Sequence, residues 1–534
     1  LSWVSCPAWA AEFYVDPQNG SPSGDGSAAM PWRTLQDVID GGLVQTQTWE
    51  SFPYVEGAKL VPKNAGAPIH GGDTIWLLSG YHGTLSIVSH YNSATITIAA
   101  APGATPKLSR IVVRSSAGWL FRGLQISPSF ATDYDPQTMV QLEQTTYHGP
   151  IREIVVEGCR LFSVPDSAGW SANDWDSKSA NGISADGEGI TLRNNRLTNV
   201  NFGISVSAHS SLVEGNLIEN FAGDGMRGLG DYTVFQYNTV KNCYKVNDNH
   251  DDGFQSWSVG SDGTVGTGEV TGVVLRGNRI INYEDPNQPF RCTLQGIGMF
   301  DGTFVDWVIE NNIIITDHWH GITLLGARGS RVVNNTVLDP NDESPGPPWI
   351  KIAAHKDGTP PEDCVVRNNL ATDFTSDSVG VTEDHNLRID DAMLLFVNPT
   401  SYDLHLLPNS PAIDKGDPTL APAIDIDGTP RPVGSAIDLG AYEWTENPPD
   451  PDAGYPNFDV ETPDRVAPDG TATGDSVNLG DSAASGSNGS RSGSSCSAAP
   501  GPEQSAAWLL VAALLSLIVA RLLVARRRGV RRPL

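Results

Sequence analysis

One short pattern recurs along the middle of the chain and restricts its fold more than any other feature. A run of β-branched and apolar residues ends in a turn, usually at asparagine, and a second short apolar run follows. Aligned, the copies place seven asparagines in one column, with Cys159 in the same place: Asn195, Asn216, Asn238, Asn278, Asn312, Asn335 and Asn369. The shortest spacings are 21, 22 and 23 residues, and a fixed period of this length is typical of solenoids.

A second column lies between the copies, in segments with the pattern x-Gly-apolar-x-x. Its apolar residues are predicted to stack inward: Ile183, Ile204, Met226, Phe254, Ile297 and Ile322. The residues after them are predicted to face outward on one parallel sheet: Ser184, Ser205, Arg227, Gln255, Gly298 and Thr323. A strand–turn–strand unit cannot bury its apolar side alone, but stacked coils can. We therefore expect stacked parallel coils with the asparagines bonded in a line at one turn, where asparagine also tolerates the left-handed conformation.

These repeats resemble the right-handed parallel β-helix of the pectate-lyase-like superfamily. Residues 13–40 are similar to the strand and short helix that cap the first coil in that class, and 71–82 and 118–127 are similar to its early coils. Residues 410–444 resemble the segment that often closes such helices. The resemblance implies an all-β solenoid, but not one reaction, because this architecture includes lyases, hydrolases, epimerases and non-enzymatic surface proteins.

The two ends of the chain have the composition of export signals. Residues 1–10 end in an A-x-A-like cleavage pattern and look like the remnant of a signal peptide. Residues 506–534 hold an apolar run of about 20 residues followed by arginines, which predicts one transmembrane helix with a cytoplasmic C-terminus. With Cys496 and a short spacer before it, this tail resembles the MYXO-CTERM type of bacterial sorting signal. That resemblance implies anchoring at the cell surface or outer envelope of a bacterium.

Composition completes the predicted organisation. Residues 11–70 are expected to form the N-terminal cap with an insertion, 71–400 the β-helix, 401–444 the closing segment, and 445–505 a disordered acidic stalk. The net charge of −28 includes six arginines in 506–534, so the remainder carries −28 − 6 = −34. Such a body repels phosphates, which excludes nucleic-acid binding. We expect a monomer that meets the membrane only through its C-terminal helix.

Four cysteines lie within the repeats: Cys159, Cys243, Cys292 and Cys364. Their spacing matches neither a disulfide framework nor a zinc motif. Buried thiols are the simplest interpretation. A bridge between Cys243 and Cys292 remains open in an oxidising compartment.

The densest polar segment is 245–258. Asp252 shares a column with Asp224 of the preceding coil, so the two acids are expected about one strand spacing apart. Adjacent carboxylates favour a cation or a shared proton, and Ca²⁺ is the natural partner of loop carboxylates in a secreted protein. Asp224, Asp251 and Asp252 are therefore the predicted calcium ligands. Asp-Gly is equally good turn chemistry, and Asp252 is expected to be an exposed turn acid.

The chemistry of a uronate lyase or epimerase supplies roles for the neighbouring residues. Such an enzyme neutralises the substrate carboxylate and removes the C5 proton. Arg227 is the predicted carboxylate clamp, and Lys245 or His250 the predicted base. His320 occupies the same column two coils further on and completes the catalytic set, although a structural role for His318 and His320 is as consistent with the sequence. Gln255, Trp257 and Trp319 are the predicted contacts to sugar.

Three functional hypotheses follow from these residues. The first is a surface-anchored, calcium-assisted lyase or epimerase acting on an acidic polysaccharide of uronic acids. The second is a non-catalytic carbohydrate-binding or adhesive surface protein. The third is a glycoside hydrolase that uses two of Asp224, Asp251 and Asp252 as its carboxylate pair.

Overall fold

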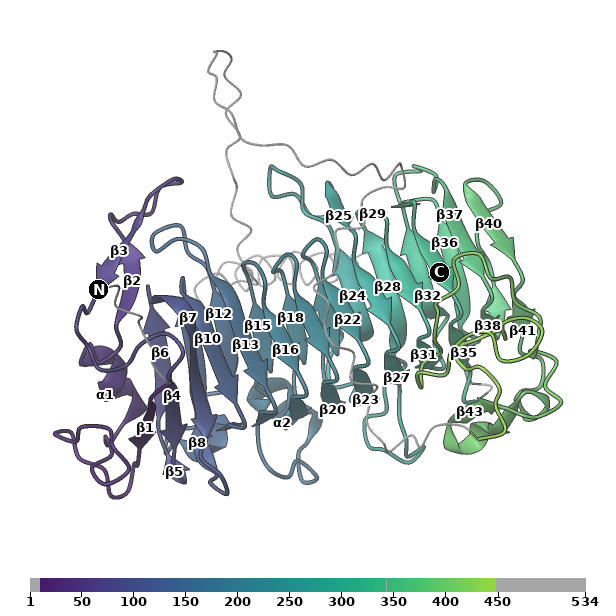
Figure 1. The fold of residues 1–534 in the computed structure, drawn as a ribbon. Coiled ribbons are helices and arrows are strands. Elements are labelled where there is room, and N and C mark those ends of the chain that lie inside the picture. Colours follow the sequence, from purple (N-terminus) through teal and green to yellow (C-terminus); the bar gives the residue numbers. More distant parts are fainter. Residues whose placement is uncertain (1–9, 342, 448–534) are drawn as a thin grey trace, which may run out of the picture. The chain divides into compact units, whose positions relative to one another are not determined.

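The computed structural model of the protein describes residues 10–341 and 343–447. Three long parallel sheets wind along this part of the chain, each coil adding one strand to each sheet (Figure 1). The predicted parallel β-helix is therefore confirmed. Residues 1–9 of the predicted signal-peptide remnant (1–10), most of the stalk and the C-terminal tail lie outside the described residues. In residues 10–341 and 343–447, no helix has the length and apolarity needed to span a membrane.

The first sheet holds the strands that precede the asparagine turn. Along its main path these are β1 (Glu12–Val15), β4 (Thr74–Leu77), β7 (Tyr91–Ala100), β10 (Ala117–Arg122), β13 (Arg152–Glu157), β16 (Thr191–Arg193), β19 (Leu212–Glu214), β22 (Val234–Gln236), β26 (Val274–Arg276), β30 (Val308–Glu310), β34 (Arg331–Val333), β37 (Cys364–Arg367) and β40 (Val381–Asp384). An antiparallel hairpin of β2 (Thr46–Trp49) and β3 (Leu60–Lys63) joins β7 at the side, within the predicted insertion.

The second sheet holds the strands that follow the asparagine turn. These are β5 (Gly80–Tyr81), β8 (Pro106–Leu108), β11 (Gln125–Ile126), β14 (Arg160–Phe162), β17 (Arg196–Val200), β20 (Leu217–Phe221), β23 (Thr239–Cys243), β27 (Arg279–Ile281), β31 (Ile313–Ile315), β35 (Thr336–Leu338), β38 (Leu370–Ala371) and β41 (Leu387–Arg388). Its strands are short, two to five residues, because each coil turns again soon after the asparagine.

The third sheet carries the x-Gly-apolar segments. Its strands are β6 (Thr84–Val88), β9 (Arg110–Arg114), β12 (Val140–Glu143), β15 (Ile183–Ala185), β18 (Ile204–Val206), β21 (Met226–Gly228), β24 (Asp252–Trp257), β28 (Gln295–Asp301), β32 (His320–Leu325), β36 (Trp349–Ala353) and β39 (Asp373–Phe374). A short fourth sheet of β25 (Glu269–Thr271), β29 (Thr303–Val305) and β33 (Ala327–Arg328) extends three of these coils.

Helices and the last hairpin lie at the margins of the coils. Helix α1 (Leu35–Asp40) begins at Thr34, whose hydroxyl accepts the Asp37 amide, and it buries Leu35, Val38 and Ile39 against the first coils. Helix α2 (Ala172–Lys178) starts with a capping box between Ser171 and Asp174. The hairpin of β42 (Phe396–Asn398) and β43 (Asp403–Leu406) follows the final coil.

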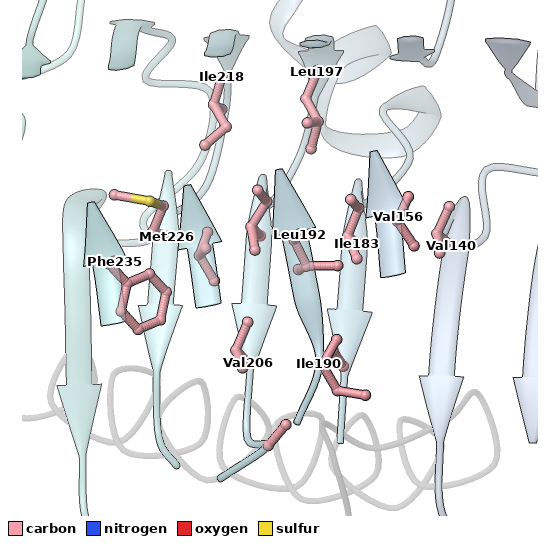
Figure 2. Close-up of a cluster of buried hydrophobic side chains, with 14 of the residues drawn as sticks. Val140, Val156, Ile183, Ile190, Leu192, Leu197, Val206, Ile218, Met226 and Phe235 are labelled. Atoms are coloured by element: carbon pink, nitrogen blue, oxygen red, sulfur yellow. The ribbon is translucent and has the colours of Figure 1, made fainter. Parts of the chain in front are cut away.

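The interior is a continuous apolar stack built from the predicted inward column. Ile183, Ile204, Met226, Phe254, Ile297 and Ile322 are all buried in one cluster. Figure 2 shows part of it, with Ile183 and Met226 of the third sheet facing Leu197 and Ile218 of the second. Alternate residues of the strands point into the stack, and large side chains from between the strands, such as Trp307, add to it.

The predicted asparagine ladder is present, and it is longer than expected. Each side-chain oxygen accepts the backbone N–H and the amide N–H of the asparagine one coil earlier, at 2.8–3.1 Å, from Asn195 through Asn369. Asn386 adds another member, and the amide of Cys159 donates to Asn195.

One expectation about this turn is wrong. The left-handed conformation belongs to the residue before each ladder asparagine, for example Asn194, Gly215 and Tyr237, and not to the asparagine itself. The ladder asparagine must instead turn its amide inward to reach its neighbours, which leaves the preceding residue to reverse the chain direction.

Candidate functional site

The candidate site lies on the outer face of the third sheet, on β21, β24, β28, β32 and β36 (Figure 1). Strand register confirms that the residues of the predicted outward column align, because Arg227 pairs with Gln255, Gln255 with Gly298, and Gly298 with Thr323. Thr323 is nevertheless buried, because His320 and Trp349 bond its hydroxyl group. Lys351 extends the column on the next coil. Five successive coils thus bring residues far apart in the sequence into one row about 4.8 Å apart.

A glycine before each strand determines where the polar side chains point. Side chains at Gly225, Gly253, Gly296 and Gly321 would meet core residues at 2.3–2.5 Å, so these glycines face the interior. The residues before them consequently face outward, and we call them the pre-glycine column: Asp224, Asp252, Gln295 and His320.

Three members of the pre-glycine column bond the residue three positions later on the outer face. Asp224 accepts Arg227 Nε at 2.6 Å, and Asp252 accepts Gln255 Nε2 at 3.2 Å. His320 Nδ1 lies 3.0 Å from Thr323 Oγ1. The sequence correctly predicted that these residues lie together, but it did not predict this pairing within each coil.

The pair of His250 and Asp252 stands at the centre of the site. Asp252 Oδ2 lies 3.0 Å from His250 Nδ1, and the histidine side chain is 62% exposed while that of the aspartate is 0% exposed. Burial raises the pKa of Asp252 to about 7, and the hydrogen bond to Asp252 raises the pKa of His250. A buried carboxylate behind an exposed imidazole fixes the tautomer of the ring and leaves its Nε2 for proton transfer.

This burial corrects the expectation that Asp252 is an exposed turn acid. Its Oδ1 atom is buried and has no hydrogen-bond partner among the described residues. A side chain at Gly298 would lie 2.4 Å from that oxygen, so glycine is needed there to accommodate the carboxyl group. The neighbouring Gln295 Oε1 is also buried without a partner in the described part of the chain. Buried, unpaired polar atoms cost stability and are typical of functional sites.

Arg227 is held on three sides. Its guanidinium lies 4.0 Å from the ring centre of Phe202 and 5.4 Å from that of Trp257, and its Nε atom binds Asp224. Asp224 also accepts the backbone N–H of Asp252 at 3.1 Å. Burial raises the pKa of Asp224, and the charge of Arg227 opposes that shift. These contacts restrain the guanidinium, whose planar fork therefore keeps a fixed geometry.

A second group of aromatic rings lies at β32 and β36, two and three coils after β24. Trp319 is 46% exposed and stacks on Trp349 with ring centres 6.3 Å apart and planes 11° from parallel. The amino group of Lys351 lies 5.2 Å from the Trp349 ring centre. Burial lowers the pKa of His318 and of His320 to about 4, so both imidazoles are neutral at pH 7. Two parallel indoles beside a cation, one exposed and one half-buried, suit a sugar ring that carries an acid.

The structure does not bring the three predicted calcium ligands together. Asp251 points away from Asp252 and accepts Cys292 Sγ, Lys245 Nζ and Asn249 Nδ2 instead. Both oxygens of Asp224 are occupied by hydrogen-bond donors, and so is one oxygen of Asp252. Because donors take these positions and Arg227 adds a positive charge, the residues do not fit a Ca²⁺ site.

Lys245 also lies apart from the site, because it contacts Asp251. Its amino group lies 3.4 Å from the buried carboxylate of Asp251, and it makes no contact with Asp224 or Asp252 in the described part of the chain. An ammonium paired with a carboxylate is a poor base, so His250 is the better candidate. The sequence analysis assigned no role to Phe202 or Gln295, although column position could have found Gln295.

Comparison with known proteins supports the fold. A family model described as a right handed β-helix region matches residues 181–346, which contain β21, β24, β28 and β32 of the site but not β36. This match confirms the predicted handedness over that range. No curated protein is significantly similar to the chain.

Several solved structures are distantly similar. A pectate lyase is 14% identical with a TM-score of 0.37, covering 82% of this chain and 96% of the lyase. The xylose complex of XylC is 10% identical with a TM-score of 0.40, covering 69% of this chain and 76% of that one. The A-module of the mannuronan C-5 epimerase AlgE6 of Azotobacter vinelandii is 14% identical with a TM-score of 0.36, covering 60% and 82%. At these identities and TM-scores the likenesses bear on no activity, and the fold rests on the three sheets and the family match.

Proposed function

We propose that the protein acts on an acidic polysaccharide by removing the C5 proton of a uronate residue, as a lyase or an epimerase. The observation that carries this proposal is the exposed His250, oriented by the buried Asp252 in the same row of coils as Arg227. A base fixed in orientation and a cation fixed between two rings are the two groups that such proton removal requires.

Arg227 and His250 have separate roles in the proposed reaction. Arg227 binds the uronate carboxylate, which withdraws charge and makes the C5 proton more acidic. His250 Nε2 takes that proton while its Nδ1–H donates to Asp252, whose position stabilises the imidazolium that forms. In a lyase the carbanion breaks the C4–O4 bond, giving a C4=C5 double bond, and the leaving oxygen takes the proton from the His250 imidazolium. In an epimerase the carbanion takes a proton from water on the opposite face, and His250 returns its proton to solvent.

The rings and Lys351 supply binding. Trp319, Trp349 and Lys351 lie on later coils of the same sheet face, so a linear polymer crossing the coils would meet them. The body of the protein is strongly acidic, and the cations of the site offset that charge where the polymer binds.

Glycoside hydrolysis is less well supported. It needs two carboxyl groups that both reach the scissile bond or its water. Asp224 and Asp252 are buried, and their outer side is covered by Arg227, His250 and Gln255. His250, in contrast, is exposed.

The test is incubation of the full chain with polymers of uronic acids. A lyase produces the ultraviolet absorbance of an unsaturated product, and an epimerase changes the uronate composition measured by NMR. Replacement of His250 by Gln should abolish either signal. His209→Gln is the matched control, because His209 is also exposed and lies 3.5 Å from a carboxylate, that of Asp231, outside the site.

Other outcomes distinguish the alternatives. Reducing ends without the absorbance would support a hydrolase, and polymer binding without turnover would support a surface adhesin. The proposed chemistry uses no calcium step, so activity should survive EDTA. Loss of activity in EDTA with recovery on adding calcium would contradict a mechanism that depends on His250 and Arg227 alone.

We infer from the sequence alone that the protein works outside the cytoplasm, anchored by residues 506–534. The support is the apolar run followed by arginines. Deleting 496–534 should release the protein into the medium without changing its melting temperature. Retention of the shortened chain on cells would contradict this proposal.

A further inference from the structure

A second polar cluster lies behind the site, where the segment 244–252 that carries His250 begins. Cys243 at the end of β23, Cys292 and Asp251 are all buried. Their ligand atoms lie within 4.8 Å of one another, so the two sulfur atoms are neighbours. Both thiols are free in the structure. None of these three side chains takes part in the chemistry proposed for His250.

The backbone places the two cysteines opposite each other. Tyr244 and Arg291 form an antiparallel bridge, and the amide of Lys245 donates to the carbonyl of Phe290 at 2.6 Å. In an antiparallel pair, the step back from Tyr244 and the step forward from Arg291 meet at Cys243 and Cys292. Directly opposed residues have Cα atoms about 4.5–5.5 Å apart, which lies within the range that a disulfide spans.

We propose that Cys243 and Cys292 form a disulfide bond when the protein folds in an oxidising environment. The two thiols lose two protons and two electrons, and one S–S bond forms. A low-molecular-weight disulfide such as oxidised glutathione accepts the two electrons and is reduced to two thiols. The bond closes a loop with 292 − 243 − 1 = 48 intervening residues, which contains His250, Asp252 and Gln255.

A metal ion is the alternative occupant of this cluster, and the contacts disfavour it. Asp251 Oδ2 lies 3.4 Å from Cys292 Sγ and 3.4 Å from Lys245 Nζ. The ammonium group therefore stands beside the oxygen that a cation would need, and it repels one. Three ligands also fall short of the four usual in a structural zinc site. A disulfide removes one S–H donor from Asp251 and leaves Lys245 and Asn249 bound to it.

Burial determines when the bond can form. It raises the pKa of both thiols, and thiolates are the reactive species. Exchange in the folded protein is therefore slow, and the cross-link forms during folding and is then protected. Cys159 and Cys364 are also buried, but among the described residues their hydrogen bonds go to backbone carbonyl groups and not to another thiol.

The experiment refolds the full chain from denaturant in a glutathione redox buffer, alkylates it in denaturant, and identifies modified cysteines by mass spectrometry. Peptides of Cys243 and Cys292 should be linked to each other, whereas Cys159 and Cys364 should be alkylated. The same chain refolded in reductant should melt about 4–5 °C lower, as expected for a loop of this length in a chain of this size. The Cys243→Ala/Cys292→Ala variant should not respond to reductant, and the matched Cys159→Ala/Cys364→Ala variant should respond like the wild type.

Two results would overturn the proposal. One is alkylation of both Cys243 and Cys292 after oxidative refolding. The other is zinc that stays bound in one equivalent through dialysis and is lost in the Cys243→Ala/Cys292→Ala variant. Because thiol state is measured without substrate, failure of the disulfide and failure of the proposed activity are separate results.

Discussion

Two polar columns run along the same coils, the buried asparagine ladder and the outward-facing pre-glycine column, and they differ in how completely their atoms are hydrogen-bonded. In the asparagine ladder every coil repeats one residue, and each interior side chain gives and receives two hydrogen bonds, as Asn216 and Asn238 do. In the pre-glycine column the residue type changes along the coils, and Asp252 and Gln295 each keep a buried oxygen without a partner in the described chain.

This difference distinguishes the asparagine ladder, which stabilises the fold, from the pre-glycine column, which carries the proposed chemistry. A residue repeated in every coil can hydrogen-bond its own copies, because the atoms of adjacent coils meet at a constant spacing. A row of different residues cannot do so, and its members must turn to their own coil, as Asp224 turns to Arg227 and His320 to Thr323. The unpaired atoms of such a row cost stability. They also leave side chains with perturbed pKa values and unused hydrogen-bonding groups, which a substrate can use.

The largest effect should come from breaking the ladder. Replacing Asn238 by Ala removes the acceptor of two N–H groups of Asn216 and one donor to Asn278, all of them buried. Each unpaired buried group costs about 1–3 kcal/mol, so the free energy of unfolding should fall by about 4 kcal/mol. Denaturant unfolding measures this. The exposed Asn287, whose side chain bonds Asp285, is the control, and Asn287→Ala should change stability by less than about 0.5 kcal/mol.

The next effect should fall on activity alone. His250→Gln removes the proposed base but leaves a side chain of similar size on an exposed position. We expect kcat/KM on the uronate polymer to fall by about 10²–10³-fold, or about 3–4 kcal/mol, with an unchanged melting curve. An equal loss in His209→Gln would show that the site is elsewhere.

Gly298→Ala should affect both properties moderately. The added methyl group would lie 2.4 Å from Asp252 Oδ1 and 2.6 Å from the Phe300 ring, so the carboxyl group must move. Stability should fall by about 2 kcal/mol, and displacement of His250 with its partner should lower kcat by about 10-fold. Gly169→Ala is the matched control, since a side chain there meets no atom within 4 Å. Full activity in Gly298→Ala would mean that the position of Asp252 does not matter.

The smallest effect concerns acid stability. The pKa of His320 is lowered to about 4 by burial, against 6.5 as its ordinary value. As the pH falls from 6.5 to 4, the unfolded chain binds the proton first and the folded state loses stability. His320→Gln should remove that penalty and so gain about 1 kcal/mol relative to wild type on going from pH 7 to pH 5.

His209 provides a control of opposite sign for that measurement. The hydrogen bond to Asp231 raises the pKa of His209, so this residue stabilises the fold below its unfolded pKa, and the gain is lost as the pH rises. His209→Gln should therefore be less stable than wild type at pH 5, by a margin that shrinks toward pH 8. The same sign in both variants would contradict the assignment of His320 as a neutral, buried imidazole.

The repeat pattern was enough to predict the coils, their register and most members of both columns, although it left out Asn386 of the ladder and Gln295 of the pre-glycine column. The shortest period of 21–23 residues predicts which residues stack on one another. The hydrogen bonds between parallel strands then set the distance between the stacked residues. The placement of Asn195 with Asn216 and of Arg227 with Gln255 followed directly. Both contacts recur from coil to coil along the axis of the β-helix, so the spacing of residues in the sequence is enough to predict them.

The directions in which neighbouring acids point, and the groups that cover them, became known only from the three-dimensional fold. Asp251 and Asp252 are adjacent in sequence, yet one faces Cys292 and the other His250. That division depends on the path of the segments 244–252 and 282–294, which lie between the repeats and follow no period. Proton affinity depends on burial, and burial depends on which loop folds over a site. A repeat pattern has no information about the loops between its copies.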